Sequence, residues 1–121
     1  MILHDIENEV QYQELISQLD EIYKQQFPFC ILIETAHVKN IHMKYLYQFG
    51  SHLNGLKSIQ PRYLQYTTIH VYDDLIYNLL YTLFIFVAKP IAKVTVIYFD
   101  GGYEQTHQPH QNIKKIKHYF P

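Results

Sequence analysis

Acidic side chains stand at the expected ends of three strands in this chain of 121 residues. They are Glu34, the pair Asp73 and Asp74, and Asp100. In open parallel sheets, ligands bind beyond the carboxyl ends of the strands, and Mg²⁺ takes carboxylate oxygens as ligands. One hypothesis is therefore a magnesium site with receiver-like or phosphoryl-transfer chemistry. The interpretation that we favour is simpler, because a short carboxylate at position 73 or 74 caps a helix and an Asp-Gly pair forms a turn.

Other sequence patterns of enzymes are missing from the chain. It contains no G-x-G-x-x-G, G-x-x-x-x-G-K-[ST] or G-x-S-x-G pattern. The eight histidines form no His-Glu-x-x-His arrangement. His107 and His110 have the spacing of a weak transition-metal site, but we favour solvated loop histidines. The serines Ser17, Ser51 and Ser58 fall on expected helices, away from strand ends, which argues against a nucleophile. We therefore expect no enzymatic activity and no cofactor.

The cysteine content and the amino terminus bear on the cellular compartment. The chain has one cysteine, so it forms no intramolecular disulfide. Cys30 lies inside the apolar run at residues 29–35, and we expect a buried structural thiol there. Met1 is soon followed by His4, Asp5 and Glu7, which does not fit a secretory signal peptide. We therefore expect an intracellular protein.

The strongest structural signal is a strand–helix–strand unit at residues 67–100. Residues 67–72 alternate and are rich in β-branched side chains, residues 75–88 form an apolar helix, and residues 94–99 are a second apolar strand. Lys89 and Pro90 end the helix, because proline disfavours helical geometry in the residue before it. Two apolar strands joined by a helix predict parallel pairing with a right-handed crossover.

The rest of the chain extends this pattern into one α/β domain spanning residues 1–121. Three- and four-residue spacing of apolar side chains predicts an amphipathic helix at residues 7–26, followed by a buried strand at 29–35. Asn40 is the expected cap of a second helix that runs to about Lys57, and Gly50 within it is expected to mark close helix–sheet contact. The predicted order is α-β-α-β-α-β-α around a mostly parallel sheet of at least three strands.

Both ends of the domain are less regular. Residues 1–6 are expected to be an edge strand or an arm. Residues 103–121 are expected to be a polar tail with a short basic amphipathic helix, in which Lys114, Lys115 and Lys117 lie opposite an apolar side. Three lysines supply few phosphate contacts, and the formal net charge is −1. We therefore do not expect a nucleic-acid partner.

The third expected helix is unusually apolar. Between residues 75 and 88 the polar side chains are Asn78 and Thr82 alone. A helix that is apolar nearly all round is normally enclosed, and one of 14 residues is shorter than the ~20 needed to cross a bilayer. We therefore expect no transmembrane segment and favour a central core helix. The alternatives are that one face meets another protein, or that the helix contacts a lipid or a small apolar ligand. The residues expected on that interface are Tyr77, Tyr81, Phe84 and Ile85.

The pattern from residue 14 to residue 99 resembles the STAS domain of bacterial anti-sigma-factor antagonists and its SpoIIAA-like and CRAL-TRIO-like relatives. The resemblance lies in the order of the elements: FPFCILIET, then AHVKNIHMKYLYQFGSHL, then TTIHVYDDLIYNLLYTLF followed by AKPIAKVTVIYF. It implies a small non-enzymatic module that binds partner proteins or, in some branches, nucleotides or lipids.

Two departures from that family pattern affect the expected function. The family carries a phosphorylated Ser or Thr at the start of the helix after the first core strand, whereas residues 40–44 here read NIHMK. We therefore expect no phosphorylation switch. The family also begins with one or two extra strands, and their absence would expose a sheet edge for another chain or a second copy. The sequence thus predicts an interaction or structural subunit with a protein partner or a homo-oligomeric state.

Overall fold

The computed structural model describes residues 1–58, 63–100 and 112–121 of an α/β protein. Its elements follow the order predicted from the sequence as far as the third strand, which confirms the expected α/β class. They are α1 (Glu9–Tyr23), β1 (Phe29–Glu34), α2 (Met43–Leu56), β2 (Leu64–Val71), α3 (Asp74–Thr82), the π-helical turn η1 (Leu83–Val87), β3 (Lys93–Phe99) and β4 (Ile113–Tyr119).

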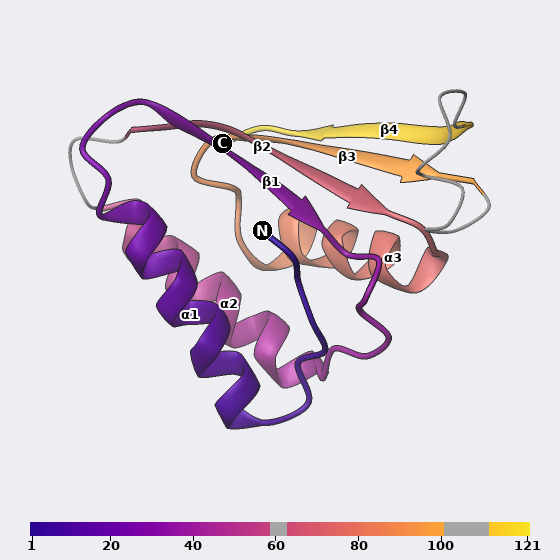
Figure 1. Ribbon diagram of the computed structural model, residues 1–121, viewed down its shortest axis with the longest axis horizontal. Coiled ribbons are helices and arrows are strands. Elements are labelled where there is room, and N and C mark those ends of the chain that lie inside the picture. Colours follow the sequence, from indigo (N-terminus) through magenta and orange to yellow (C-terminus); the bar gives the residue numbers. More distant parts are fainter. Residues whose placement is uncertain (59–62, 101–111) are drawn as a thin grey trace.

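The four strands form one sheet in the order β1-β2-β3-β4. The pairs β1–β2 and β2–β3 are parallel, as predicted, and β4 runs antiparallel to β3. Because the strand order never reverses, right-handed crossovers place α2 and α3 on the same face of the sheet. Figure 1 shows α1, α2 and α3 together on that side. The described helices therefore leave the opposite face of the sheet uncovered.

The centre of the core lies where α3 and η1 cross β2 and β3. Ile76, Leu83, Val71 and Val96 are its largest fully buried side chains. They come from an apolar helix and from inward positions of two central strands, so the predicted core role of the third helix is confirmed. Asp73 begins this helix as its N-cap, with Oδ1 accepting a hydrogen bond from the Ile76 N–H at 2.8 Å.

The predicted basic helix near the carboxyl terminus is wrong. Residues Ile113–Tyr119 form β4, an edge strand paired along β3. The three- and four-residue spacing of Ile113, Ile116 and Phe120 fits a helix face, and this local pattern gave the prediction. Pairing with β3 satisfies the backbone groups of that strand, and this long-range requirement decides the conformation. The predicted turn and His107-x-x-His110 lie outside the described residues.

The prediction that Cys30 is a buried thiol is also wrong, because the side chain is exposed. A continuous apolar run usually belongs to a strand that is covered on both faces. Here β1 is covered on one face, so alternate residues point outward. Ile31 is buried whereas its neighbour Leu32 is 51% exposed.

The first residues of the chain form short bridges, in agreement with the expected edge strand or arm. Ile2 pairs parallel to Glu34, and the Leu3 N–H donates to the Glu34 carbonyl at 2.9 Å. A second bridge joins Ile6 to Ile41. The chain's own first residues therefore occupy part of the free edge of β1.

The second helix differs from its prediction in two details. Its N-cap is His42 rather than Asn40, with the His42 Nδ1 accepting from the Lys44 N–H at 3.3 Å. Gly50 marks a close contact, as predicted, but the neighbour is Val87 of η1 and not the sheet. Among the described residues, no helix is both long enough and apolar enough to cross a membrane.

Candidate functional site on the open face of the sheet

Three of the four acids of the hypothetical magnesium site bind other groups of the protein, and the fourth, Asp100, is exposed directly after β3. Asp73 caps α3, Asp74 accepts a hydrogen bond from the Tyr98 hydroxyl at 2.8 Å, and Glu34 accepts one from the Tyr72 hydroxyl at 2.7 Å. Across residues 1–58, 63–100 and 112–121, no three His, Cys, Asp or Glu side chains gather in a group that could hold a metal ion. The sheet also has no reversal of strand order, the feature that opens a ligand crevice at strand ends.

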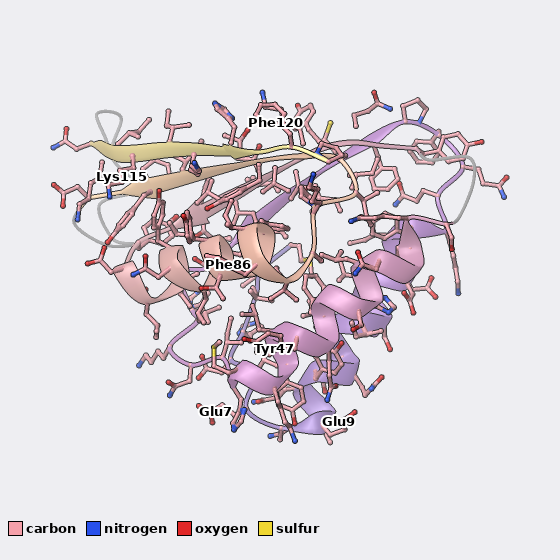
Figure 2. The ribbon with its side chains drawn as sticks, turned by 180° about the vertical axis from the view of Figure 1, so that it is seen from behind. Glu7, Glu9, Tyr47, Phe86, Lys115 and Phe120 are labelled. Carbon is pink, nitrogen blue, oxygen red and sulfur yellow. The ribbon has the colours of Figure 1, made fainter. Side chains whose placement is uncertain are left out.

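The predicted interface on the third helix reaches the surface only in part. Phe84 is 8% exposed and contacts the Tyr119 ring at 5.2 Å between centroids, so it belongs to the core. Tyr77 is half-buried against Tyr98. Tyr81 and Ile85 are exposed, and the sequence interpretation missed Phe86, which is 74% exposed. We call Tyr81, Ile85 and Phe86 the helix patch. Figure 2 shows its Phe86 on the same side of the molecule as Tyr47 of α2.

The three lysines of the predicted basic tail lie over aromatic rings instead of forming a separate basic helix. The amino group of Lys114 lies 4.8 Å from the Tyr98 ring centroid, that of Lys115 lies 5.4 Å from Tyr77, and that of Lys117 lies 5.8 Å from Tyr119. These distances allow cation–π attraction. Lysines on an edge strand also discourage pairing with a further strand, so the β4 edge is a poor docking site.

The surface that the described helices leave uncovered is the outer side of the four strands, which we call the open face. Strand register assigns its members, because they alternate with buried residues and pair with one another. They are Leu32, Glu34, Tyr66, Thr68, His70, Lys93, Thr95, Ile97, Ile116 and His118. Phe120 follows β4, and Figure 2 shows it on the side of the sheet away from the helices.

Side-chain contacts join the strands across the open face. The His70 ring meets Phe99 edge-on at 5.0 Å, and Tyr72 stacks on Phe99 at 5.6 Å. Glu34 contacts both His70, at 3.4 Å, and Tyr72. On the other half, the Thr95 hydroxyl lies 3.0 Å from the Nδ1 atom of His118. The open face is therefore a connected surface whose side chains are ordered by their neighbours.

The open face mixes exposed apolar side chains with neutral polar ones and carries little charge. Leu32, Tyr66 and Ile116 are 51%, 50% and 53% exposed, and Phe120 is 63% exposed. Among the outward-paired positions of the described strands, the fully charged side chains are Glu34 and Lys93. Parallel strands usually have both faces covered, and contiguous exposed apolar surface commonly marks an interaction site. The sequence signal was the apolar content of β1 and β3, from which we predicted buried strands without assigning helices to either face.

A second feature lies on the other side of the sheet. An apolar cavity of about 120 Å³ lies between the inner side of the strands and the helices that cover it. Its wall includes Leu15, Leu19, Ile33, Ile41 and Phe49. A small apolar ligand is one of the alternatives predicted from the sequence, and this cavity is a space that such a ligand could occupy.

Comparison with known proteins adds no relatives: no protein-family model, no curated protein and no solved structure matches this chain.

Proposed function

We propose that this chain is a non-enzymatic protein-interaction subunit that binds a second copy of itself through the open face of its sheet. The observation that supports this proposal is that half-exposed apolar side chains, namely Leu32, Tyr66 and Ile116, lie on a face of the sheet that no described helix covers. Two sheets can pack face to face at about 10 Å with their outward side chains interdigitating, as in β-sandwiches.

The size of the open face sets the expected strength of this contact. Four strands about 4.8 Å apart, each with about six paired residues at about 3.3 Å, cover roughly 20 Å by 20 Å. Two copies would then bury on the order of 800 Å² in total, which is below the ~1,200–2,000 Å² of stable specific interfaces. We therefore expect reversible association at micromolar or weaker affinity rather than a permanent dimer.

The charges of the open face favour a second copy as the occupant. Lys93 begins β3 and Glu34 ends β1, so the two charges lie near opposite corners of the paired region. Two open faces pack together around a two-fold axis that lies in the plane between the sheets. If that axis passes over Thr68, at right angles to the line from Glu34 to Lys93, each Glu34 lies over the Lys93 of the partner copy. Such an arrangement brings opposite charges together and opposes no like charges, so self-association meets no electrostatic barrier.

The test compares two isoleucines of similar exposure on different surfaces. Ile116 lies on the open face and is 53% exposed, whereas Ile85 lies in the helix patch and is 48% exposed. Sedimentation velocity at increasing protein concentration should show association for the wild type and for Ile85→Glu. Ile116→Glu should stay monomeric, because it brings a charge into the contact.

Two results would contradict the proposed surface. The first is a wild type that stays monomeric at millimolar concentration. The second is a loss of association in Ile85→Glu with Ile116→Glu unaffected, which would move the contact to the helix patch. Circular dichroism of both variants checks that each is folded.

The STAS-like character of the fold is part of the same proposal. Its support is the succession of β1, α2, β2, α3 and β3 in a parallel arrangement. The start of α2 carries His42, Met43 and Lys44 where that family has a phosphorylated Ser or Thr. We accordingly propose that association depends on concentration and not on phosphorylation at this position.

A further inference from the structure

The cavity of about 120 Å³ lies between two separate groups of buried side chains. The larger group joins the sheet to α3, η1 and α2, and the smaller consists of Ile6, Tyr12 and Tyr45 with their partly buried neighbours. Both groups contribute to the cavity wall. The space therefore lies where α1 and the first residues of the chain meet the main core.

The inclination of the helices accounts for this space. Figure 1 shows α1 and α2 at a steep angle to the sheet rather than flat against it. At Gly50, α2 contacts η1 so closely that a Cβ atom there would lie 2.4 Å from Val87 Cγ1. This contact fixes α2 against η1. Leu15 of α1 and Ile33 of β1 both belong to the cavity wall.

The chemistry of the cavity wall selects the class of ligand. Within the part of the chain that the structure describes, no Lys, Arg, His, Asp or Glu side chain lines it. The hydroxyl of Thr35, one of the few polar groups in the wall, already donates to the His70 carbonyl at 2.7 Å. A charged ligand would be buried without a partner, which is very unfavourable. A neutral apolar molecule loses no hydrogen bond on entry.

The volume limits the ligand to a small one. An engineered apolar cavity of about 150 Å³ in another protein stays free of water and binds benzene or xenon. The cavity here is somewhat smaller, so one six-membered ring or a xenon atom is the largest occupant that we expect without rearrangement. We propose that this cavity is a binding site for a small, neutral, apolar molecule, separate from the open face.

The first test uses benzene, toluene and benzoate with the wild-type chain. Benzene should raise the melting temperature in a saturable manner, and it should shift the methyl resonances of Leu15 and Ile33 in NMR spectra. Toluene controls for ligand size, and benzoate, an anion of comparable size, should have no effect. The methyl groups of Leu32, which lie on the open face, should not shift.

The second test fills the cavity. Leu15→Phe places a larger side chain in the cavity wall and should reduce the volume of the cavity. Leu32→Phe makes the same substitution on the exposed side of β1, away from the cavity. We expect benzene affinity to fall at least tenfold in Leu15→Phe and to be unchanged in Leu32→Phe. The proposal is overturned if neither benzene nor xenon shifts the Leu15 and Ile33 methyl resonances of the wild type, or if benzoate shifts them equally. The wild-type experiment keeps the proposal falsifiable if Leu15→Phe fails to fold.

Discussion

Gly50 of α2 and Val87 of η1 touch so closely that no side chain fits between them. A Cβ atom on Gly50 would lie 2.4 Å from Val87 Cγ1 and 3.5 Å from the Ala88 Cβ atom. Gly55, five residues further along the same helix, has no neighbouring atom within 4 Å of its hypothetical Cβ. A larger residue at position 50 would therefore collide with Val87, whereas one at position 55 has free space around it.

This contrast predicts opposite effects of alanine at the two positions. Gly55→Ala should stabilise the protein by roughly 0.5–1 kcal/mol, because alanine loses less backbone entropy in a helix. Gly50→Ala should destabilise it by about 1–3 kcal/mol, since overpacking against stiff, branched Val87 outweighs that gain. Urea denaturation measures both. Adding Val87→Ala to Gly50→Ala should recover part of the loss. Equal effects at the two glycines would refute the close contact.

Two buried tyrosines on the inner side of the sheet form a second matched pair. The Tyr98 hydroxyl donates to Asp74, whereas the Tyr119 hydroxyl is buried without a hydrogen-bond partner in the described structure. Tyr98→Phe should cost about 1–3 kcal/mol, because it removes a hydrogen bond to a carboxylate. Tyr119→Phe should be neutral or stabilising by up to about 1 kcal/mol, since it removes an unpaired polar group. A large destabilisation by Tyr119→Phe would show that its hydroxyl has a partner after all.

Tyr98 and Tyr119, together with Tyr23 of α1, predict that the folded protein loses stability at alkaline pH. Burial, followed by the hydrogen bond to Asp74 and the nearby carboxylates, raises the pKa of Tyr98 from 10.0 to about 12. Burial raises the pKa values of Tyr23 and Tyr119 to about 12 as well. The folded state then holds protons that the unfolded state releases. This contribution is complete below pH 10 and is lost as the pH rises from about 10 through about 12.

The measurement is the free energy of unfolding between pH 8 and pH 12. Each of these tyrosines should add a negative slope of up to about 1.4 kcal/mol per pH unit. Tyr119→Phe should make the decline shallower while leaving stability at pH 8 nearly unchanged. A wild-type stability that is constant up to pH 12 would contradict the raised pKa values.

The N-cap of α3 supplies a fourth prediction. Asp73 accepts the Ile76 N–H and also places a negative charge at the helix N-terminus. Asp73→Ala should cost about 1 kcal/mol, and Asp73→Asn clearly less, because asparagine also caps well. Thermal or urea unfolding of both variants measures the difference. Equal losses would indicate that the charge of Asp73, and not its capping hydrogen bond, is what stabilises the helix.

Local sequence patterns predicted the elements of the first hundred residues well. The spacing of apolar residues predicted α1, and the apolar runs predicted β1 and β3. A cap at Asp73 or Asp74 was predicted because a short carboxylate before a helix accepts the N–H groups of its first turn, and the structure assigns the cap to Asp73. The carboxyl-terminal strand was missed, because the spacing of Ile113, Ile116 and Phe120 fits one face of a helix. Only pairing with β3 distinguishes the two.

The candidate sites were predicted less well, and the reason is again long-range. The acids at the strand ends could be named from the sequence, but their partners could not, because the Tyr98 and Tyr72 hydroxyls that Asp74 and Glu34 bind come from elsewhere in the chain. Likewise, burial of Phe84 and exposure of Ile85 depend on where η1 lies against Tyr119.

The sequence alone thus determined the α/β class, the parallel pairing of three strands and the capping of α3, because these depend on neighbouring residues and on the crossover rule. The tertiary structure decided which surfaces are free. The strand order β1-β2-β3-β4 places the described helices on one side. That arrangement exposes Leu32 and Ile116, and the inclination of α1 and α2 leaves the apolar cavity. Neither follows from periodicity, since an apolar strand residue has the same local pattern whether a helix, a second copy or water lies against it.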